Sequence, residues 1–340
     1  MKNKSILHII FLISGAIFIA LLSLVHSSAY YDPNTLLSDK FKYDDFEIKY
    51  RAYIPDDYKE KKYPVVLYLH TAGEIGNDNI RQLEDGLPLL LFKYDYIDQY
   101  PAIYLFPQSP RGSKWVDVEW KSGIYSTEEI KESPSLKSAI GLVEYYAEEY
   151  NGDKNRIYVT GISMGGYGTW DLLARHPGVF AAAVPICGGA DPEMAANIST
   201  TPVRAYHGDA DDIVPPSGDI AVNKALKEIN ADAELTIIPG ANHYGFWLDA
   251  YIESIDWMFG QTKNNEANAK NGETETTDSR PAEIESTESA QTNETSDKNL
   301  AKNALLISTG AIILFVICFI VAYKIILYIY ISNRERNRDD

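Results

Sequence analysis

The sequence has few cysteines and a shortage of positive charge. Only two of its 340 residues are cysteines, too few for a fold held together by disulfides. Lysine and arginine number 31 against 48 acidic residues, and the resulting net charge of −17 repels the phosphate backbone of nucleic acids. The sequence therefore excludes a disulfide scaffold and predicts no nucleic-acid partner. Its hydrophobic content of 45% is nevertheless sufficient for a buried core.

The first 29 residues have the pattern of a secretory signal. Lys2 and Lys4 precede an apolar run over residues 6–25, and small residues lie at the −3 and −1 positions of a cleavage site after Ala29. A run of this length also suffices to span a bilayer, so an uncleaved signal anchor is the alternative. We therefore predict that residues 1–29 are a signal peptide or a signal anchor.

The C-terminal region predicts a membrane anchor. Residues 304–331 carry a single charge, Lys324, and the uncharged part over 304–323 is long enough to cross a hydrocarbon core. Arginines follow between residues 334 and 338, and positive charge favours the cytoplasmic side. The sequence thus predicts a single-pass transmembrane segment, a basic cytoplasmic tail over 332–340 and an extracellular domain.

Between the predicted membrane segment and the rest of the chain lies a polar stretch, residues 261–303. It is rich in Glu, Thr, Asn and Ser, and has almost no large apolar side chain. Such a segment cannot bury enough surface to offset the entropy lost on ordering. We expect a disordered linker there, and one folded domain over residues 30–260.

Within residues 30–260, short apolar runs alternate with helical patterns. Residues 46–54 alternate apolar and polar side chains, which predicts a half-buried strand at a sheet edge. Six later runs are almost continuously apolar, as in parallel strands covered on both faces. They cover residues 65–70, 102–107, 156–162, 181–187, 203–207 and 234–238. Helices are predicted at 133–147, 163–176, 218–229 and 246–259. The pattern predicts a doubly wound, mostly parallel α/β sheet that binds ligands at the carboxyl ends of its strands.

The sharpest motif is Gly161-Ile162-Ser163-Met164-Gly165, which matches the G-x-S-x-G pattern between a predicted strand and a predicted helix. The glycines remove Cβ atoms that would collide with neighbouring backbone in so tight a turn. Ser163 Oγ is thereby held above the sheet at a helix N-terminus, where free amides stabilise a developing oxyanion. The motif predicts a nucleophilic serine; a phosphate-binding turn is the alternative.

A nucleophilic serine needs a base and an acid partner, in the chain order Ser, acid, His. His243 follows the last predicted strand and is the candidate base, whereas His70 and His207 end strands. Asp211 is the first choice for the acid, followed by Asp212 and then Asp209. The acidic cluster does not fit a calcium loop, because valine and isoleucine occupy the positions that require glycine and glutamate. No metal site is predicted.

Two further features surround the predicted site. The oxyanion is expected to be bound by the backbone amides of Ala72, which follows the strand at 65–70, and Met164. The long irregular stretch over 108–133 contributes Trp115 and Trp120, which together with Tyr244 and Trp247 form a possible aromatic wall for the substrate. Packing in the core is the alternative for each of these rings.

Four segments of the sequence resemble the α/β-hydrolase superfamily, in the phospholipase/carboxylesterase-like branch that includes predicted peptidases and feruloyl esterases. They are LYLHTAGEIGND, RIYVTGISMGGYGTWDLLARHP, HGDADDIVP and PGANHYGFW. The resemblance covers residues 45–260 and implies an α/β-hydrolase fold with Ser163, Asp211 and His243 as the triad. One departure concerns Thr71, because the family usually has glycine after the strand-end histidine.

These inferences together predict a membrane-tethered extracellular serine hydrolase that cleaves carboxylic esters through an acyl-enzyme, with no cofactor. Its substrate would be a small or polymer-linked ester. A peptidase of the prolyl-oligopeptidase type is the first alternative, since the same triad cleaves amides. A non-enzymatic surface receptor or adhesin on a hydrolase fold is the second.

Overall fold

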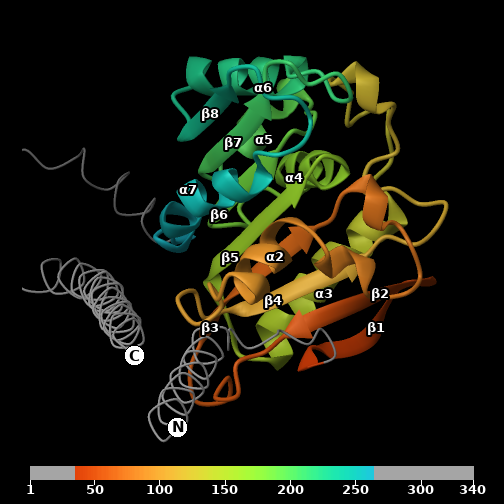
Figure 1. The fold of residues 1–340 in the computed structure, drawn as a ribbon, viewed down its shortest axis with the longest axis vertical. Helices are drawn as coiled ribbons and strands as arrows, with labels where there is room; N and C mark the ends of the chain where they lie inside the picture. The colour runs from red at the N-terminus through yellow and green to blue at the C-terminus, as the bar shows by residue number, and fades with distance from the viewer. Residues whose placement is uncertain (1–34, 264–340) are drawn as a thin grey trace, which may run out of the picture. The chain divides into compact units, whose positions relative to one another are not determined.

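An eight-stranded sheet runs through residues 35–263, the part of the chain that the computed structural model describes (Figure 1). Its strands are β1 (Leu37–Tyr43), β2 (Phe46–Tyr53), β3 (Tyr63–Leu69), β4 (Ile103–Gln108), β5 (Gly152–Ile162), β6 (Ala182–Ile186), β7 (Val203–Gly208) and β8 (Ala233–Ile238). Their order is β1-β2-β4-β3-β5-β6-β7-β8. The pairs β1–β2 and β2–β4 are antiparallel, and all later pairs are parallel. The predicted mostly parallel sheet is therefore confirmed.

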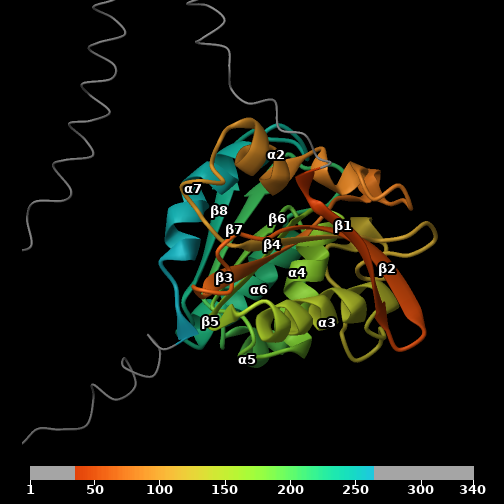
Figure 2. The ribbon, with the colours of Figure 1, turned by 90° about the horizontal axis from the view of Figure 1, so that it is seen from below.

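Helices cover both faces of this sheet (Figure 2). They are α2 (Gly86–Lys93), α3 (Pro134–Glu149), α4 (Met164–Arg175), α5 (Ala195–Ile198), α6 (Ser217–Glu228) and α7 (Trp247–Phe259). Short 3₁₀ turns lie at Ala72–Glu74, Arg81–Leu83, Trp120–Ser122 and Pro192–Met194. Buried side chains of α3, α4, α5 and α6 pack in one core cluster, and those of α2 and α7 pack in another.

Strand β3 shows why the central strands read as continuous apolar runs. Its side chains alternate between the two cores: Val65 and Leu67 join the cluster with α3, α4 and α6, whereas Val66 and Tyr68 join the cluster with α2 and α7. Successive side chains of a strand point to opposite faces, so a strand covered by helices on both sides is apolar at every position.

Two elements differ from the sequence-based expectation. The strand predicted at the edge is β2, but β1 lies outside it and pairs with it from Leu37 to Tyr43. Strand β1 is exposed at nearly every position and therefore lacks the alternation that would reveal it. Helix α2 was also not predicted, because its sequence GLPLLLFK is apolar on all sides and has no helical period.

The predicted signal segment at 1–29 and transmembrane segment at 304–331 lie outside the described residues. Within residues 35–263, none of the helices combines the length and the apolar character that a bilayer-spanning helix requires. Cys187 is a free, buried cysteine, and Cys318 also lies outside the described part.

Candidate active site

Ser163 lies in the tight turn between β5 and α4 and has a left-handed backbone conformation, with φ of 56° and ψ of −113°. A Cβ atom on Gly165 would collide with the backbone carbonyl of Leu69, and one on Gly161 would collide with the carbonyl of Gly165. The Ser163 amide donates a hydrogen bond of 2.8 Å to the carbonyl of Ile186, which fixes the turn to the neighbouring strand β6. The glycines therefore allow the strained turn that presents the serine, as the motif predicts.

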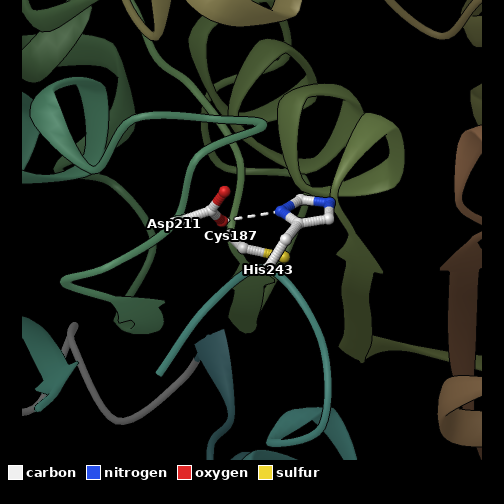
Figure 3. Close-up of side chains that lie close together, drawn as sticks. All are labelled: Cys187, Asp211 and His243. Atoms are coloured by element: carbon white, nitrogen blue, oxygen red, sulfur yellow. Dashed lines mark hydrogen bonds and ion pairs between the residues drawn. The ribbon is translucent and has the colours of Figure 1, made fainter. Parts of the chain in front are cut away.

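His243 connects Ser163 to Asp211. Its Nε2 lies 2.8 Å from Ser163 Oγ. Its Nδ1 lies 2.6 Å from Asp211 Oδ2 (Figure 3). An ionised carboxylate only accepts hydrogen bonds, so Nδ1 donates to Asp211 and Nε2 accepts from the serine hydroxyl. His243 is 3% exposed, and the three side chains come from three loops at the carboxyl edge of the sheet.

The loop after β7 explains why Asp211, rather than either neighbouring aspartate, faces the histidine. Asp211 Oδ1 accepts hydrogen bonds of 2.9 Å from the amides of Ile213 and Val214, which leaves Oδ2 directed at His243. Asp212 is exposed, and exposed Asp209 instead accepts from the amide of Gly240. Burial alone would raise the pKa of Asp211, but its hydrogen-bond donors hold that pKa well below the usual range.

The two predicted oxyanion amides belong to segments that pack against each other. Ala72 begins the 3₁₀ turn after β3, and Met164 begins α4. Neither amide has a hydrogen-bond acceptor within residues 35–263. The first turn of α4 lies against the end of β3, since a Cβ on Gly165 would also lie 3.0 Å from the carbonyl of His70. Two free amides thus flank the edge of the sheet where Ser163 lies.

The unusual Thr71 is accommodated in an extended conformation with φ of −75°, which any residue adopts. Its hydroxyl accepts from the amide of Gly73, and its amide donates to Glu74 Oε2 over 2.6 Å, a reciprocal capping box. Burial raises the pKa of Glu74 to about 7, although both hydrogen bonds with Thr71 oppose this shift. The threonine therefore orders the loop that carries Ala72.

The four aromatic residues of the predicted wall occupy different environments. Trp115 is fully buried, donates its indole N–H to the carbonyl of His70 and belongs to the core, so the wall prediction is wrong for this residue. Trp120 is half-buried beneath the Lys114 ammonium. Tyr244 is 59% exposed, and its ring lies 5.2 Å from that of His243. The Trp247 ring lies 6.0 Å from the same histidine but is buried in the core cluster with α2 and α7, which corrects the wall prediction for this residue as well.

Sequence reasoning did not assign two residues beside Asp211. Cys187 follows β6 directly, and its sulfur lies within 4.8 Å of a carboxylate oxygen of Asp211 and a ring nitrogen of His243 (Figure 3). A cation held by these three groups would displace the proton that His243 shares with Asp211. His207, in β7, lies 3.4 Å from Asp211 Oδ2. The position of Cys187 and His207 at the carboxyl ends of strands was the sequence signal that could have placed them near the site, since ligands bind at that edge of such a sheet.

The chain is similar to several known esterases. Feruloyl esterase B of Neurospora crassa is 29% identical over 157 residues, which cover 46% of this chain and 49% of the relative. Acetylxylan esterase A of Emericella nidulans is 31% identical over 93 residues, covering 27% of this chain and 29% of the relative. The crystal structure of a thermostable esterase matches with a TM-score of 0.61 and 33% identity, covering 68% of this chain and 64% of that one.

The matches thus span half or less of the length of these two curated relatives. The model of the dienelactone hydrolase family, by contrast, matches residues 51–278. Because that match extends over more than half of the sequence, the chain belongs to the dienelactone hydrolase family of the α/β-hydrolase superfamily.

Proposed function

We propose that this protein is a serine hydrolase that cleaves carboxylic esters, with Ser163 as the nucleophile, His243 as the base and Asp211 as its acid partner. The observation that carries this proposal is the pair of hydrogen bonds, of 2.8 Å and 2.6 Å, by which His243 contacts both other residues. A serine hydroxyl becomes an effective nucleophile only when a positioned base removes its proton.

The reaction proceeds through an acyl-enzyme. His243 Nε2 takes the hydroxyl proton while Ser163 Oγ attacks the ester carbonyl, and the imidazolium that forms is stabilised by Asp211. The amides of Ala72 and Met164 donate to the oxyanion, and each such donor contributes about 10²–10³-fold to the rate. His243 then protonates the leaving alkoxide. A water molecule, deprotonated by the same histidine, attacks the acyl-enzyme and releases the acid.

The exposed ring of Tyr244 provides the substrate surface in this proposal, and the buried ring of Trp247 packs behind it. Both flank His243, and their centroids lie 5.5 Å apart. Exposed aromatic faces bind planar, partly apolar groups well. Esters of aromatic acids fit such a surface, and feruloyl esterase B is among the relatives by name. We therefore propose aromatic acyl esters as the preferred substrate class.

A pair of serine variants tests the activity. Ser163→Ala should reduce turnover of p-nitrophenyl acetate and methyl ferulate by at least 10⁴-fold. Ser199→Ala is the control, because that hydroxyl only donates to the carbonyl of Ala196 at the end of α5. Parallel assays on aminoacyl p-nitroanilides measure the peptidase alternative. Undiminished ester hydrolysis by the Ser163 variant would refute the proposal.

We further propose that a signal segment at 1–29 exports the chain and that the hydrolase domain occupies residues 30–260. A polar linker at 261–303 then joins this domain to a membrane helix at 304–331, which is followed by a cytoplasmic tail at 332–340. The support is the sequence itself: two apolar runs with basic flanks and a polar segment between. The catalytic domain would then be extracellular.

Fractionation of cells that express the full-length chain tests this arrangement. Ester hydrolysis should sediment with membranes, resist extraction by alkaline carbonate, and be accessible to a membrane-impermeant serine probe on intact cells. The matched control lacks residues 304–340 and should release the activity into the soluble fraction. Activity that is soluble in the full-length chain, or shielded from the probe, contradicts the arrangement.

A further inference from the structure

His207 is a fully buried histidine with a hydrogen-bond acceptor at each ring nitrogen. Its Nδ1 lies 2.7 Å from Asp219 Oδ2, and its Nε2 lies 2.9 Å from the carbonyl oxygen of Val214. A neutral imidazole carries only one N–H, so one of these oxygens would face a ring lone pair. With Asp219 as a carboxylate, both contacts are satisfied only when the ring is a doubly protonated imidazolium. Burial opposes that charge, but hydrogen bonds with the carboxylates of Asp211 and Asp219 raise the pKa of His207 to about 10.

This cation lies behind the acid of the proposed triad. His207 Nε2 is 3.4 Å from Asp211 Oδ2, the same oxygen that accepts from His243 Nδ1. Asp219 on α6 is itself held by the indole N–H of Trp170 over 2.6 Å, and Trp170 lies on α4, the helix that begins directly after Ser163. Asp211 is therefore contacted by His243 on one side and by His207 on the other, and His207 is in turn held by Asp219.

Two further titratable groups lie near His207 and its carboxylate partners. Tyr167 on α4 and Cys187 after β6 also face the carboxylates of Asp211 and Asp219. Burial, followed by these negative neighbours, raises the pKa of both groups, so that both are neutral at physiological pH. Among these groups, the charged ones are thus the two carboxylates and the His207 imidazolium.

We propose that His207 is a positioning residue for the Ser163–His243–Asp211 group: as a buried imidazolium it orients Asp211 Oδ2 and offsets the negative charge that His243 experiences. This inference rests on the proposed hydrolase function. Without the cation, the two carboxylates would favour protonated His243, and the unprotonated base would be available only at higher pH. A unit charge about 6–8 Å away at an effective dielectric constant of about 20 shifts a titration by about one to two pH units.

The test measures kcat/KM for p-nitrophenyl butyrate from pH 5 to pH 10 in the full-length protein and its His207→Gln variant. Glutamine retains a polar side chain of similar size but has no charge. We expect the acidic midpoint to move up by about one to two pH units, the activity at pH 5, on the acidic limb, to fall about 10- to 100-fold, and the activity to recover toward wild type above pH 9.

The control is His176→Gln, which removes another histidine–carboxylate contact, that of His176 with Glu132 at the far end of α4. Its acidic midpoint should equal that of the wild type. A purely structural role for His207 would instead lower kcat/KM by a similar factor at every pH. A uniform loss of that kind, or an unchanged profile, overturns the proposal.

A second measurement depends neither on activity nor on how the variant folds. In the full-length chain labelled with ¹⁵N-histidine, one imidazole should keep both ring protons at pH 8.5. If every histidine ring is neutral at that pH, the proposal is wrong. Absence of esterase activity in the wild type would refute the proposed function, while the nitrogen shifts would still decide the charge of His207.

Discussion

The exchange of Asp211 for asparagine changes one atom and should invert the hydrogen bonding of the proposed base. In the native loop, Asp211 Oδ1 accepts from the amides of Ile213 and Val214, and Oδ2 accepts from His243 Nδ1. The two amide donors hold the oxygen of asparagine in the Oδ1 position. Its NH₂ group therefore faces His243 Nδ1, which must then accept rather than donate.

This change places the histidine proton on Nε2, opposite the Ser163 hydroxyl, and removes the base. We expect kcat for ester hydrolysis to fall about 10⁴-fold, which corresponds to about 5.5 kcal/mol, the size that this exchange has in serine proteases. KM should change little, because Asp211 is not expected to contact the substrate. The assay is steady-state turnover of p-nitrophenyl butyrate at pH 8, with circular dichroism to verify folding.

Asp212→Asn is the matched control, since this exposed neighbour does not contact His243. It should retain kcat within about twofold. A folded Asp211→Asn variant that keeps more than a tenth of wild-type kcat would refute the tautomer argument. An equal loss in both variants would show that the loop, rather than the carboxylate, is responsible.

Three further outcomes follow from the structure. Gly165→Ala should lower the unfolding free energy by more than about 2 kcal/mol in urea titrations, because its Cβ would collide with the Leu69 carbonyl. Gly178 has open space around it, so Gly178→Ala should lower the unfolding free energy by only about 1 kcal/mol, because of its positive φ. Equal effects of the two substitutions would contradict the steric argument. The pKa of Glu74 is raised to about 7 in the fold, so the free energy of unfolding should fall as pH rises from about 4.5 to 7. Glu74→Gln should reduce this fall, as measured by urea unfolding at pH 5 and pH 8. An equal fall in the variant and the wild type would contradict this prediction. Tyr244→Ala should raise KM for methyl ferulate at least fivefold more than KM for p-nitrophenyl acetate, and an equal change would remove Tyr244 from the substrate surface.

Much of the fold was predictable because its signals are local. The strands that lie between two helical layers are apolar at every position, and the tight turn at Ser163 requires glycine on both sides. Strand β1 was not predictable in this way: its side chains are exposed, so its pairing with β2 leaves no hydrophobic pattern in the sequence.

The site was predictable in its residue types but not in its contacts. Asp209, Asp211 and Asp212 lie within four residues, and only the loop's own amides decide which carboxylate turns toward His243. The sequence left Trp115 open between a substrate wall and core packing; the structure buries its ring in the core, where the indole N–H donates to the carbonyl of His70. Such contacts join segments far apart in the chain, which periodicity and spacing do not reveal.

The charge of His207 illustrates the same limit. Its sequence position marks only a strand-end histidine, and the partners that favour the imidazolium come from the following loop and from α6. Burial of a histidine usually favours the neutral ring, and His70 follows that rule: burial lowers its pKa to about 4. Two histidines at equivalent strand ends therefore differ in charge, with His70 neutral and His207 positive, because their hydrogen-bond partners differ.

The central claim, that Ser163 is a nucleophile activated by His243, is tested most directly by covalent labelling. The full-length protein is treated with a fluorophosphonate and digested, and the modified peptide is identified by mass spectrometry. We expect one adduct per chain, on Ser163, and at least a 100-fold slower labelling rate in the His243→Ala variant. No adduct on folded protein, an adduct on another residue, or equal labelling of the variant would contradict the claim.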